Sequence, residues 1–367
     1  MSLSLTINSV STNYSYKGFD NGNFVLNIAA GSEIVEIATP LPLDTTFHDM
    51  EFDVYFLIRK DINESDIFQV IDSNDTRIGW CIPTNALGSD LHDYASNIHF
   101  LRYAYKAIEG ALKKLDDNLF KVDANYNANN QINFSDLFHP YTALLVVSRS
   151  NITTKGALFD FERALPSLIG YGYQPLTAKD PSLLKHVGLN PAGKKLKITL
   201  TSQDVENNEL INSILTSILA YEDNPTFRFF YLYQIFELLI ENILKIEQED
   251  VIEQLYQAKL DPARSREILR ELKDMIGEKD RIKLLIEKYS SCNSDLEDIR
   301  EACRNFLSSV GNVSGTSFED YFYPVRNFLV HRLRELPPAG SAPLSNIVLH
   351  TLYLLPRILF NFKKPAP

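Results

Sequence analysis

The chain has 367 residues, of which 45% are hydrophobic and 23% are charged, so it is long enough for about two globular domains. It has no apolar run of about 18 residues, and its N-terminus lacks the basic and long apolar segments of a signal peptide. The three cysteines, Cys81, Cys292 and Cys303, form no C-x-x-C pair, which argues against a disulfide framework and a zinc site. We therefore expect a cytoplasmic protein without a membrane span.

The net charge of −11 is distributed unevenly along the chain. Residues 225–367 contain 19 Lys and Arg against 20 Asp and Glu, whereas residues 1–224 contain 17 against 27. Because an acidic surface repels nucleic acid, we expect any contact with a polyanion in the C-terminal half.

Residues 1–202 are predicted to form an α+β module. Short apolar segments separated by Gly, Asn, Asp and Pro indicate strands, residues 93–118 and 156–168 have helical spacing, and residues 121–137 are typical of a loop. The predicted strands are Phe24–Ala29, Glu33–Ala38, Glu51–Arg59, Ile67–Ile71, Arg77–Cys81, Tyr141–Val147 and Lys195–Thr201. We interpret this module as a regulatory one that senses a trigger ligand or protein.

Residues 203–367 are predicted to form an all-helical domain. Asn224 and Pro225 provide a cap and first turn for a helix over Thr226–Ile246, whose apolar spacing indicates a central core helix. The other predicted helices are Glu206–Tyr221, Asp250–Leu260, Pro262–Ile276, Asp280–Tyr289, Asp295–Val310 and Leu344–Phe362. The last helix is so apolar that it needs a partner inside the domain or across a dimer.

Two motifs outside the last helices are rejected on their context. Gly188–Lys195 nearly fits the phosphate loop G-x-x-x-x-G-K-[ST], but Lys195 replaces the Mg²⁺-binding hydroxyl and a strand follows where a helix is required. We therefore predict a turn before a strand there. His92 and His99 lack a third ligand at a suitable spacing, so we expect no metal site.

The segment Pro324–Arg334 combines basic, amide and imidazole side chains on one predicted helix. Pro324 is expected in its first turn, where the missing N–H costs nothing. At about 100° per residue, one face of the helix is apolar and the opposite face is mixed. The apolar face comprises Phe322, Val325, Leu329, Leu333 and Leu336, and the mixed face comprises Tyr323, Asn327, His331 and Arg334. The mixed face predicts a contact surface.

Arg326-Asn327-Phe328-Leu329-Val330-His331 resembles the R-x4-H motif of the HEPN superfamily, in which a polar residue often follows the arginine. The resemblance covers roughly residues 205–362 and includes the helix that carries Glu237. A β-containing module before a HEPN domain is also similar to the layout of the Apea-like abortive-infection proteins. This resemblance implies a HEPN-like helical bundle and a metal-independent endoribonuclease that needs no cofactor. It also implies an anti-phage defence or growth-arrest effector, a toxin whose substrate is RNA.

The resemblance further implies a homodimer in which both copies of the motif meet at one composite site. Metal-free RNA cleavage requires a base, an acid and positive charge, and one histidine cannot be base and acid at once. Within that resemblance, His331 is assigned to proton transfer, Arg326 to phosphate stabilisation and Asn327 to orientation. Three further residues are expected to contact RNA, namely Tyr323, Arg332 and Arg334, with Glu237 in a supporting role.

Two alternative interpretations remain open from the sequence. The helical domain could be a non-catalytic HEPN-like module that binds RNA, a nucleotide or a protein. In the other alternative, the protein is structural or mediates interactions, and the R-x4-H spacing is accidental.

Overall fold

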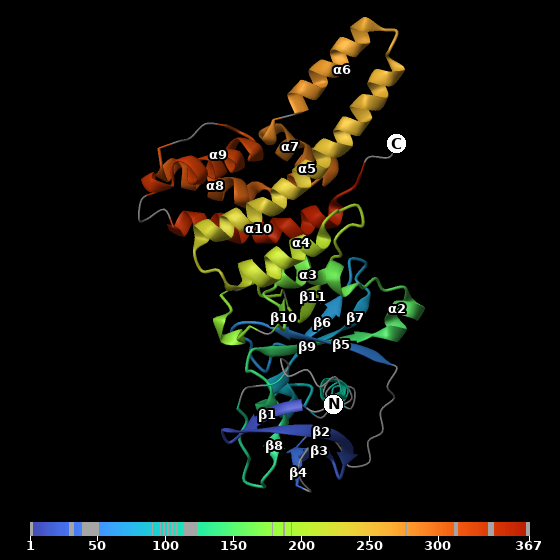
Figure 1. The fold of residues 1–367 in the computed structure, drawn as a ribbon, viewed down its shortest axis with the longest axis vertical. Coiled ribbons are helices and arrows are strands. Elements are labelled where there is room, and N and C mark those ends of the chain that lie inside the picture. Colours follow the sequence, from blue (N-terminus) through green and yellow to red (C-terminus); the bar gives the residue numbers. More distant parts are fainter. Residues whose placement is uncertain are drawn as a thin grey trace. The chain divides into compact units, whose positions relative to one another are not determined.

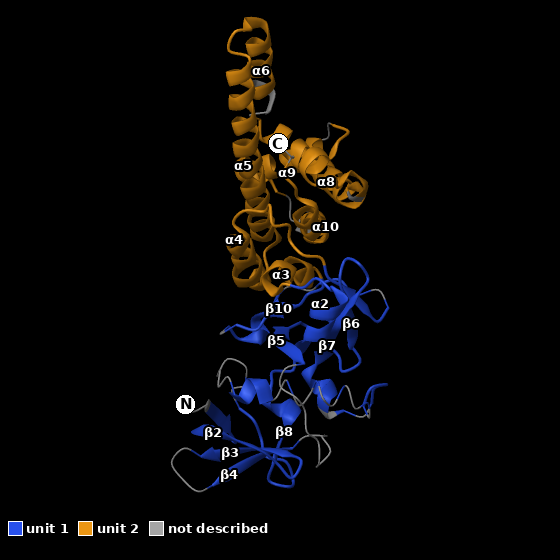
Figure 2. Ribbon diagram, turned by 90° about the vertical axis from the view of Figure 1, so that its right-hand side faces the viewer, with its two compact units in different colours: residues 1–159, 171–198 blue, residues 160–170, 199–367 orange. Residues whose placement is uncertain are grey.

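The computed structural model describes residues 3–28, 33–38, 51–89, 91–95, 97, 100, 103, 106, 109–113, 120, 123–177, 179–185, 188–191, 193–275, 277–311, 315–336 and 341–364. The chain divides into two compact units, which are residues 1–159 with 171–198 and residues 160–170 with 199–367 (Figure 2). The first unit is β-rich and the second is helical (Figure 1). The predicted order, an α+β region followed by a helical region, is therefore confirmed, while the domain boundary after residue 202 stays a prediction.

The first sheet of the β-rich unit has the strand order β1-β2-β3-β4-β8. Neighbouring strands are antiparallel except that β8 is parallel to β4. The strands are β1 (Leu3–Ile7), β2 (Val10–Asp20), β3 (Asn23–Ile28), β4 (Ile34–Ala38) and β8 (Ile132–Asn133). Asn8 and Ser9 both have positive φ and form the two-residue turn between β1 and β2, which fits the right-handed twist of a hairpin.

The second sheet has the strand order β10-β5-β9-β7-β6-β11, and only the β11–β6 pair is parallel. Its strands are β5 (Phe52–Ile58), β6 (Phe68–Ile71), β7 (Arg77–Pro83), β9 (Thr142–Ser148), β10 (Gln174–Pro175) and β11 (Lys195–Lys197). Strand β9, which has the sequence TALLVVS, is buried almost throughout, as its continuous apolar run favours. The unit also contains α2 (Arg149–Lys155) and 3-10 turns at Thr84–Gly88, Phe134–Leu137 and Pro181–Leu183.

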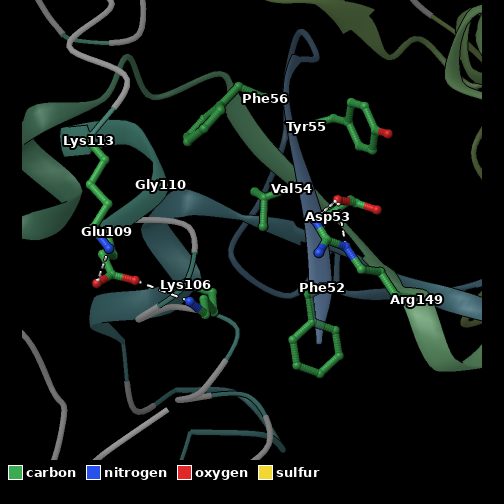
Figure 3. Close-up of a pocket in the computed structure, with 10 residues that line it drawn as sticks. All are labelled: Phe52, Asp53, Val54, Tyr55, Phe56, Lys106, Glu109, Gly110, Lys113 and Arg149. Carbon is green, nitrogen blue, oxygen red and sulfur yellow. Dashed lines mark hydrogen bonds and ion pairs between the residues drawn. The ribbon is translucent and has the colours of Figure 1, made fainter. Parts of the chain in front are cut away.

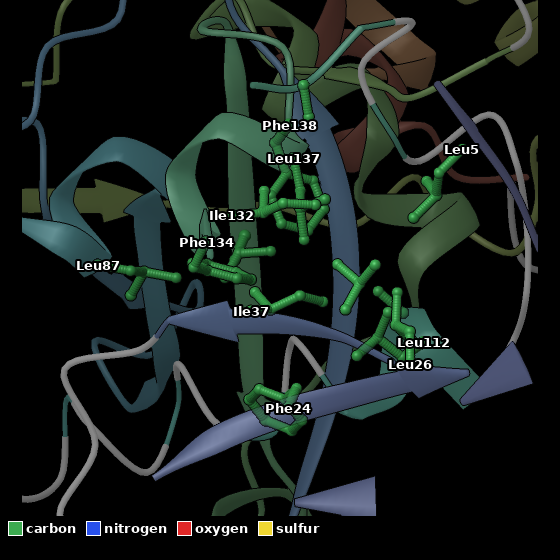
Figure 4. Packing of buried hydrophobic residues seen from close by; sticks show 14 of the residues in the cluster. Leu5, Phe24, Leu26, Ile37, Leu87, Leu112, Ile132, Phe134, Leu137 and Phe138 are labelled. Carbon is green, nitrogen blue, oxygen red and sulfur yellow. The ribbon is translucent and has the colours of Figure 1, made fainter. Parts of the chain in front are cut away.

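Both sheets contribute to one hydrophobic core in this unit. Leu26 and Ile37 from the first sheet and Val146 from the second belong to it, together with Phe134 and Phe138 from the segment between β8 and β9. Figure 4 shows these phenylalanines lying among the aliphatic side chains of the core. Phe138 also stacks on Phe56, with 5.8 Å between the ring centroids. Aromatic burial of this kind holds short strands with polar connections in place.

All seven predicted strands occur, but several other predictions in this region were wrong. The segment predicted as a loop, 121–137, contains β8 and a 3-10 turn, and residues 93–95 of the predicted helix form a turn instead. Positions 100, 103, 106 and 109–113 are helical, while much of the remaining predicted helix lies outside the described residues. The helix expected from Gly156 begins at Phe161, since Gly156 adopts a left-handed conformation that ends α2.

The helical unit begins with α3 (Phe161–Gly170), and its remaining helices follow residue 199. They are α4 (Asn208–Ser213), α5 (Pro225–Gln257), α6 (Pro262–Met275), α7 (Glu278–Leu284), α8 (Glu297–Ser309), α9 (Phe318–His331) and α10 (Ser341–Asn361). α4 continues as a π turn over Ile214–Ile218 and a 3-10 turn over Leu219–Tyr221, and α7 as a π turn over Leu285–Tyr289. Short 3-10 turns also occur at Asn293–Asp295 and Leu333–Glu335.

Helix α5 is capped as predicted, but it is longer than predicted. The Asn224 side chain accepts a hydrogen bond from the Thr226 N–H at 2.8 Å, and Pro225 occupies the first turn. The predicted helices Thr226–Ile246 and Asp250–Leu260 belong to one continuous helix, so the break between them was wrong. At that position, buried Glu247 accepts hydrogen bonds from Lys288 at 2.5 Å and from the Tyr289 hydroxyl at 2.7 Å. This satisfied carboxylate lets one helix continue to Gln257.

Helix α10 packs against α5 and α8, so the apolar partner that its sequence requires is present inside the unit. Over Ala342–Asn361 it is also long and apolar enough to cross a membrane, with a mean hydropathy of 1.2. Half of that segment is buried within the structure. This burial is what a core helix requires.

Phe322 of α9 lies at the centre of an aromatic cluster in the helical unit. Its ring is fully buried, and its centroid lies 5.7 Å from Phe229, 5.4 Å from Tyr233 and 5.0 Å from Phe236 on α5. Phe318, one turn earlier on α9, stacks on it at 4.9 Å. These contacts hold α9 against the central helix.

We expect Phe322→Ala to lower the free energy of unfolding of the helical unit by about 3–5 kcal/mol, because it leaves a cavity among four rings. Phe227→Ala on α5 is the matched control, since that ring is 50% exposed, and it should change the free energy by roughly 0.5 kcal/mol or less. Urea unfolding followed by far-ultraviolet circular dichroism measures both. Equal losses in the two variants would contradict the packing role of Phe322.

Candidate active site

The helix that carries the R-x4-H motif begins at a well-formed cap. Ser317 and Asp320 make a capping box, in which the Asp320 carboxylate accepts the backbone N–H groups of Thr316 at 3.0 Å and Ser317 at 3.1 Å. Lys279 forms an ion pair with the same carboxylate at 2.5 Å. The ion pair with Lys279, followed by the two N–H donors, holds the pKa of Asp320 well below its ordinary value.

The limits of α9 correct two predictions about the motif segment. Pro324 was expected in the first turn, but the cap lies upstream and places it in the helix interior. Leu333 and Leu336 were expected on the apolar face, but α9 ends at His331, and Leu333 lies in the following 3-10 turn with 41% of its surface exposed. The face that is buried in α9 consists of Phe318, Tyr321, Phe322, Val325, Phe328 and Leu329.

Arg326 lies where α5, α7 and α9 meet. Its Nη2 is 3.4 Å from Glu237 Oε1 on α5, and its Nε is 3.7 Å from Glu278 Oε1 on α7. Its Nη1 donates to Asn327 Oδ1 at 3.3 Å, and its guanidinium carbon is 5.8 Å from the centre of the Tyr233 ring. The structure therefore brings together three of the predicted site residues, Arg326, Asn327 and Glu237.

Tyr233 and Glu278 belong to this cluster, although the sequence did not indicate either of them as a site residue. The Tyr233 hydroxyl donates to Glu278 Oε1 at 2.6 Å. Burial, reinforced by the Glu278 carboxylate, raises the pKa of Tyr233 well above its ordinary value, so the hydroxyl remains a donor. Glu278 is thus fixed by one neighbour while it faces the Arg326 guanidinium.

His331 is exposed at the last position of α9, one turn after Asn327. Within the part of the chain that the structure describes, its ring has no hydrogen-bond partner. Val330 beside it is 47% exposed. The structure therefore gives His331 no bond to the Arg326 cluster and leaves its imidazole exposed.

The residues proposed to contact RNA are placed differently from one another. Arg332 lies 5.3 Å from the centre of the Phe328 ring and is paired with Glu335, whose carboxylate accepts from its Nε at 2.9 Å. Arg334 is exposed in the following 3-10 turn, and Tyr323 is half-buried on α9. Only Arg334 among these three offers an exposed charge without an ion pair to a described residue.

The cysteines and the metal-ligating side chains do not form a second reactive site among the described residues. All three cysteines are buried. Burial raises the pKa of the Cys81 thiol to about 12, which disfavours a thiolate nucleophile. No group of three or more His, Cys, Asp and Glu side chains gathers in the described part of the chain, from which His99 is missing.

A cavity of about 420 Å³ lies beside β5 in the β-rich unit (Figure 3). Lys106 and Lys113 pair with Glu109 at 3.1 and 2.8 Å, and Arg149 pairs with Asp53 at 2.6 Å. Figure 3 shows the first group on the helical side and the second on the strand side. The lining residues carry three positive and two negative charges, and each of them is in an ion pair, so the cavity has little unpaired charge to attract a charged substrate.

We expect Asp320→Asn to destabilise the helical unit by about 1–2 kcal/mol at neutral pH, because α9 loses a charged cap. Since the folded-state pKa of Asp320 is lowered, its contribution is present above the unfolded-state value of about 3.9 and is lost as the pH falls below it. The difference between wild type and variant should therefore shrink in acid. Glu319→Gln, in the same turn, is the control, and denaturation at several pH values provides the measurement. An equal loss in both variants would contradict the assignment.

Comparison of this chain with protein-family models, with curated proteins and with solved structures found no match.

Proposed function

We propose that the helical unit is a HEPN-like, metal-independent endoribonuclease that acts as a homodimer, and that it serves as an anti-phage defence or growth-arrest effector. The observation that carries this proposal is the arrangement of α9, where an oriented guanidinium and an exposed imidazole lie on one helix. Arginine matches the geometry of phosphate oxygens, and histidine can take or give a proton near neutral pH.

The contacts of Arg326 orient its guanidinium but do not use all of its hydrogen-bond donors. Its distances to Glu237 and Glu278, 3.4 and 3.7 Å, exceed the roughly 2.7–2.9 Å of a close charge-assisted hydrogen bond. A guanidinium has five N–H donors, and a quarter of this side chain is exposed. Donors therefore remain for a phosphate.

The two carboxylates beside Arg326 differ in their solvent exposure and in their hydrogen bonds. The Glu237 side chain is 42% exposed, whereas the Glu278 side chain is 20% exposed and accepts from Tyr233. We infer that a phosphate displaces Glu237 and leaves Glu278 in place. Glu237 and Glu278 are then positioning residues, which hold the guanidinium until substrate arrives.

The proposed reaction needs two copies of His331. One His331 removes the proton from the ribose 2′-hydroxyl, whose oxygen attacks the adjacent phosphorus, while Arg326 stabilises the charge of the phosphorane. The partner subunit's His331 gives a proton to the 5′-oxygen as the P–O bond breaks. The products are a 2′,3′-cyclic phosphate and a free 5′-hydroxyl.

The exposed side of α9 supplies the proposed dimer contact. Val330, which is 47% exposed, lies two turns after Tyr323 on the same side of α9 and next to His331 in the chain, outside the buried face. An apolar residue among polar neighbours is suited to a two-fold interface, in which the same helix meets its own copy. RNA would then bind across both copies, with Arg334 contacting the phosphate backbone and Tyr323 stacking on a base.

We expect the purified protein to cleave single-stranded RNA in EDTA, and His331→Ala or Arg326→Ala to reduce the rate at least about 100-fold. His350→Ala is the matched control, because that histidine lies on α10 and its ring packs on Tyr353. Gel assays of labelled RNA measure the rates, and circular dichroism verifies the fold. Unchanged cleavage by His331→Ala would contradict the assignment of His331 to the site. RNA binding without cleavage by the wild type would favour a non-catalytic binding module.

A composite site also predicts how mixed dimers behave. Wild-type and His331→Ala chains are co-expressed in equal amounts. If both histidines are needed, the activity per amount of total protein should be about one quarter of that of the wild type, because only dimers with two intact chains react. Sites that work independently would give about one half. A series of mixing ratios, measured with the same RNA assay, distinguishes a squared from a linear dependence.

A further inference from the structure

The β-rich unit contains an aromatic and basic surface that the proposed nuclease site does not use. It consists of two adjoining cavities of about 260 and 380 Å³, and both are lined by Trp80 and Tyr94. The smaller cavity is completed by Arg77, Asn97, Phe100 and Tyr103, and the larger by Gln69, Gly193, Lys194 and Lys195. Their sizes lie around the lower limit of small-ligand pockets, which occupy about 300–1,000 Å³.

The strand register explains why aromatic and basic groups meet here. Gln69 on β6 is paired with Trp80 on β7 and also with Lys195 on β11. Directly paired residues on neighbouring strands project from the same face of a sheet. Trp80, Gln69 and Lys195 therefore form a row across three strands, with an indole at one end and an ammonium group at the other.

Aromatic rings form the wall of the smaller cavity. The Tyr94 ring lies 5.3 Å from Trp80, edge to face, and 6.5 Å from Phe100 in a stacked arrangement. Trp80 and Tyr94 are only half-buried. Phe100 is 5% exposed, and its buried ring supports the Tyr94 ring on the side away from solvent. Partly exposed rings that are held from behind are suited to stacking on a planar ligand.

Positive charge lines the larger cavity. Lys194 donates to the Ser65 carbonyl at 2.9 Å, which holds it at the rim. Lys195 is exposed, and its ammonium group has no ion-pair or hydrogen-bond partner among the residues that the structure describes. Gly193 has φ +65° and faces open space, since a Cβ there would meet nothing within 4 Å. A phosphate can thus approach both ammonium groups.

We propose that this surface binds a free nucleotide, with the nucleobase against Trp80 and Tyr94 and the phosphates at Lys194 and Lys195. Stacking accepts any base, the Gln69 amide can hydrogen-bond the ribose or the base edge, and the lysines supply the charge. A small ligand fits the region better than a nucleic-acid strand does, because residues 1–224 have an excess of negative charge that repels long polyanions. This inference does not depend on nuclease activity.

The single tryptophan of the chain makes the proposal directly measurable, since Trp80 is the only indole. Titration of the full-length protein in EDTA with ATP, GTP, CTP or UTP should quench its emission when excitation lies beyond nucleobase absorption. Adenosine should bind at least about tenfold more weakly than ATP, because it lacks the phosphates. No quenching by any of the four nucleotides, or equal affinity for adenosine and ATP, would overturn the proposal.

Matched variants distinguish the loss of a ligand contact from a general loss of folding. Lys195→Gln should weaken ATP binding about tenfold, whereas Lys197→Gln, on the same strand but paired with Asp75 outside both cavities, should not. Tyr94→Leu should weaken it about fivefold or more, while Tyr94→Phe keeps the ring and should bind normally. Equal effects within either pair would contradict the site, and so would tighter binding of a single-stranded RNA oligomer than of ATP.

Discussion

The helical unit depends on the junction of α5, α7 and α9, where buried rings and a shared charge cluster act together. Phe322 packs into the aromatic surface of α5, and Arg326, one turn later, reaches Glu237 and Glu278 beside the Tyr233 ring. The rings supply most of the stabilisation, because a partly exposed ion pair with long contacts contributes about 1 kcal/mol at most. The charges instead fix the direction of the guanidinium. The packing of the rings therefore holds α9 in place, and the ion pairs orient the guanidinium of Arg326.

This division suits α9 to the site that we propose. Its buried face is fully used in contacts within the unit, and its N-terminus is secured by Asp320 and Lys279. The other end stops at His331, which projects from the last turn without a partner among the described residues. A firmly anchored helix with an open end suits a site completed by a second copy, because little further ordering is needed on assembly.

The sequence predicted the elements better than the contacts between them. Apolar runs located β9 and the core helix α5, whereas β1 and β2 were missed because Ser, Thr and Asn leave them without a continuous apolar run. The available signals were the alternation of apolar and polar residues over Leu3–Ile7 and the turn-forming residues Asn8 and Ser9 that follow it. Glu237 was predicted near Arg326, but Glu278 and Tyr233 were not. Their proximity arises from the packing of three separate helices, which no local pattern encodes.

The chemistry of the RNA ends gives the most direct test of the proposed mechanism. A 2′-hydroxyl nucleophile predicts fragments with 2′,3′-cyclic phosphate and 5′-hydroxyl ends, formed in EDTA, and no cleavage when the scissile nucleotide carries a 2′-deoxyribose. Mass spectrometry of the products from matched RNA and 2′-deoxy substrates measures both. Fragments with 5′-phosphate ends, or cleavage of the 2′-deoxy substrate, would contradict a mechanism in which His331 activates the ribose hydroxyl.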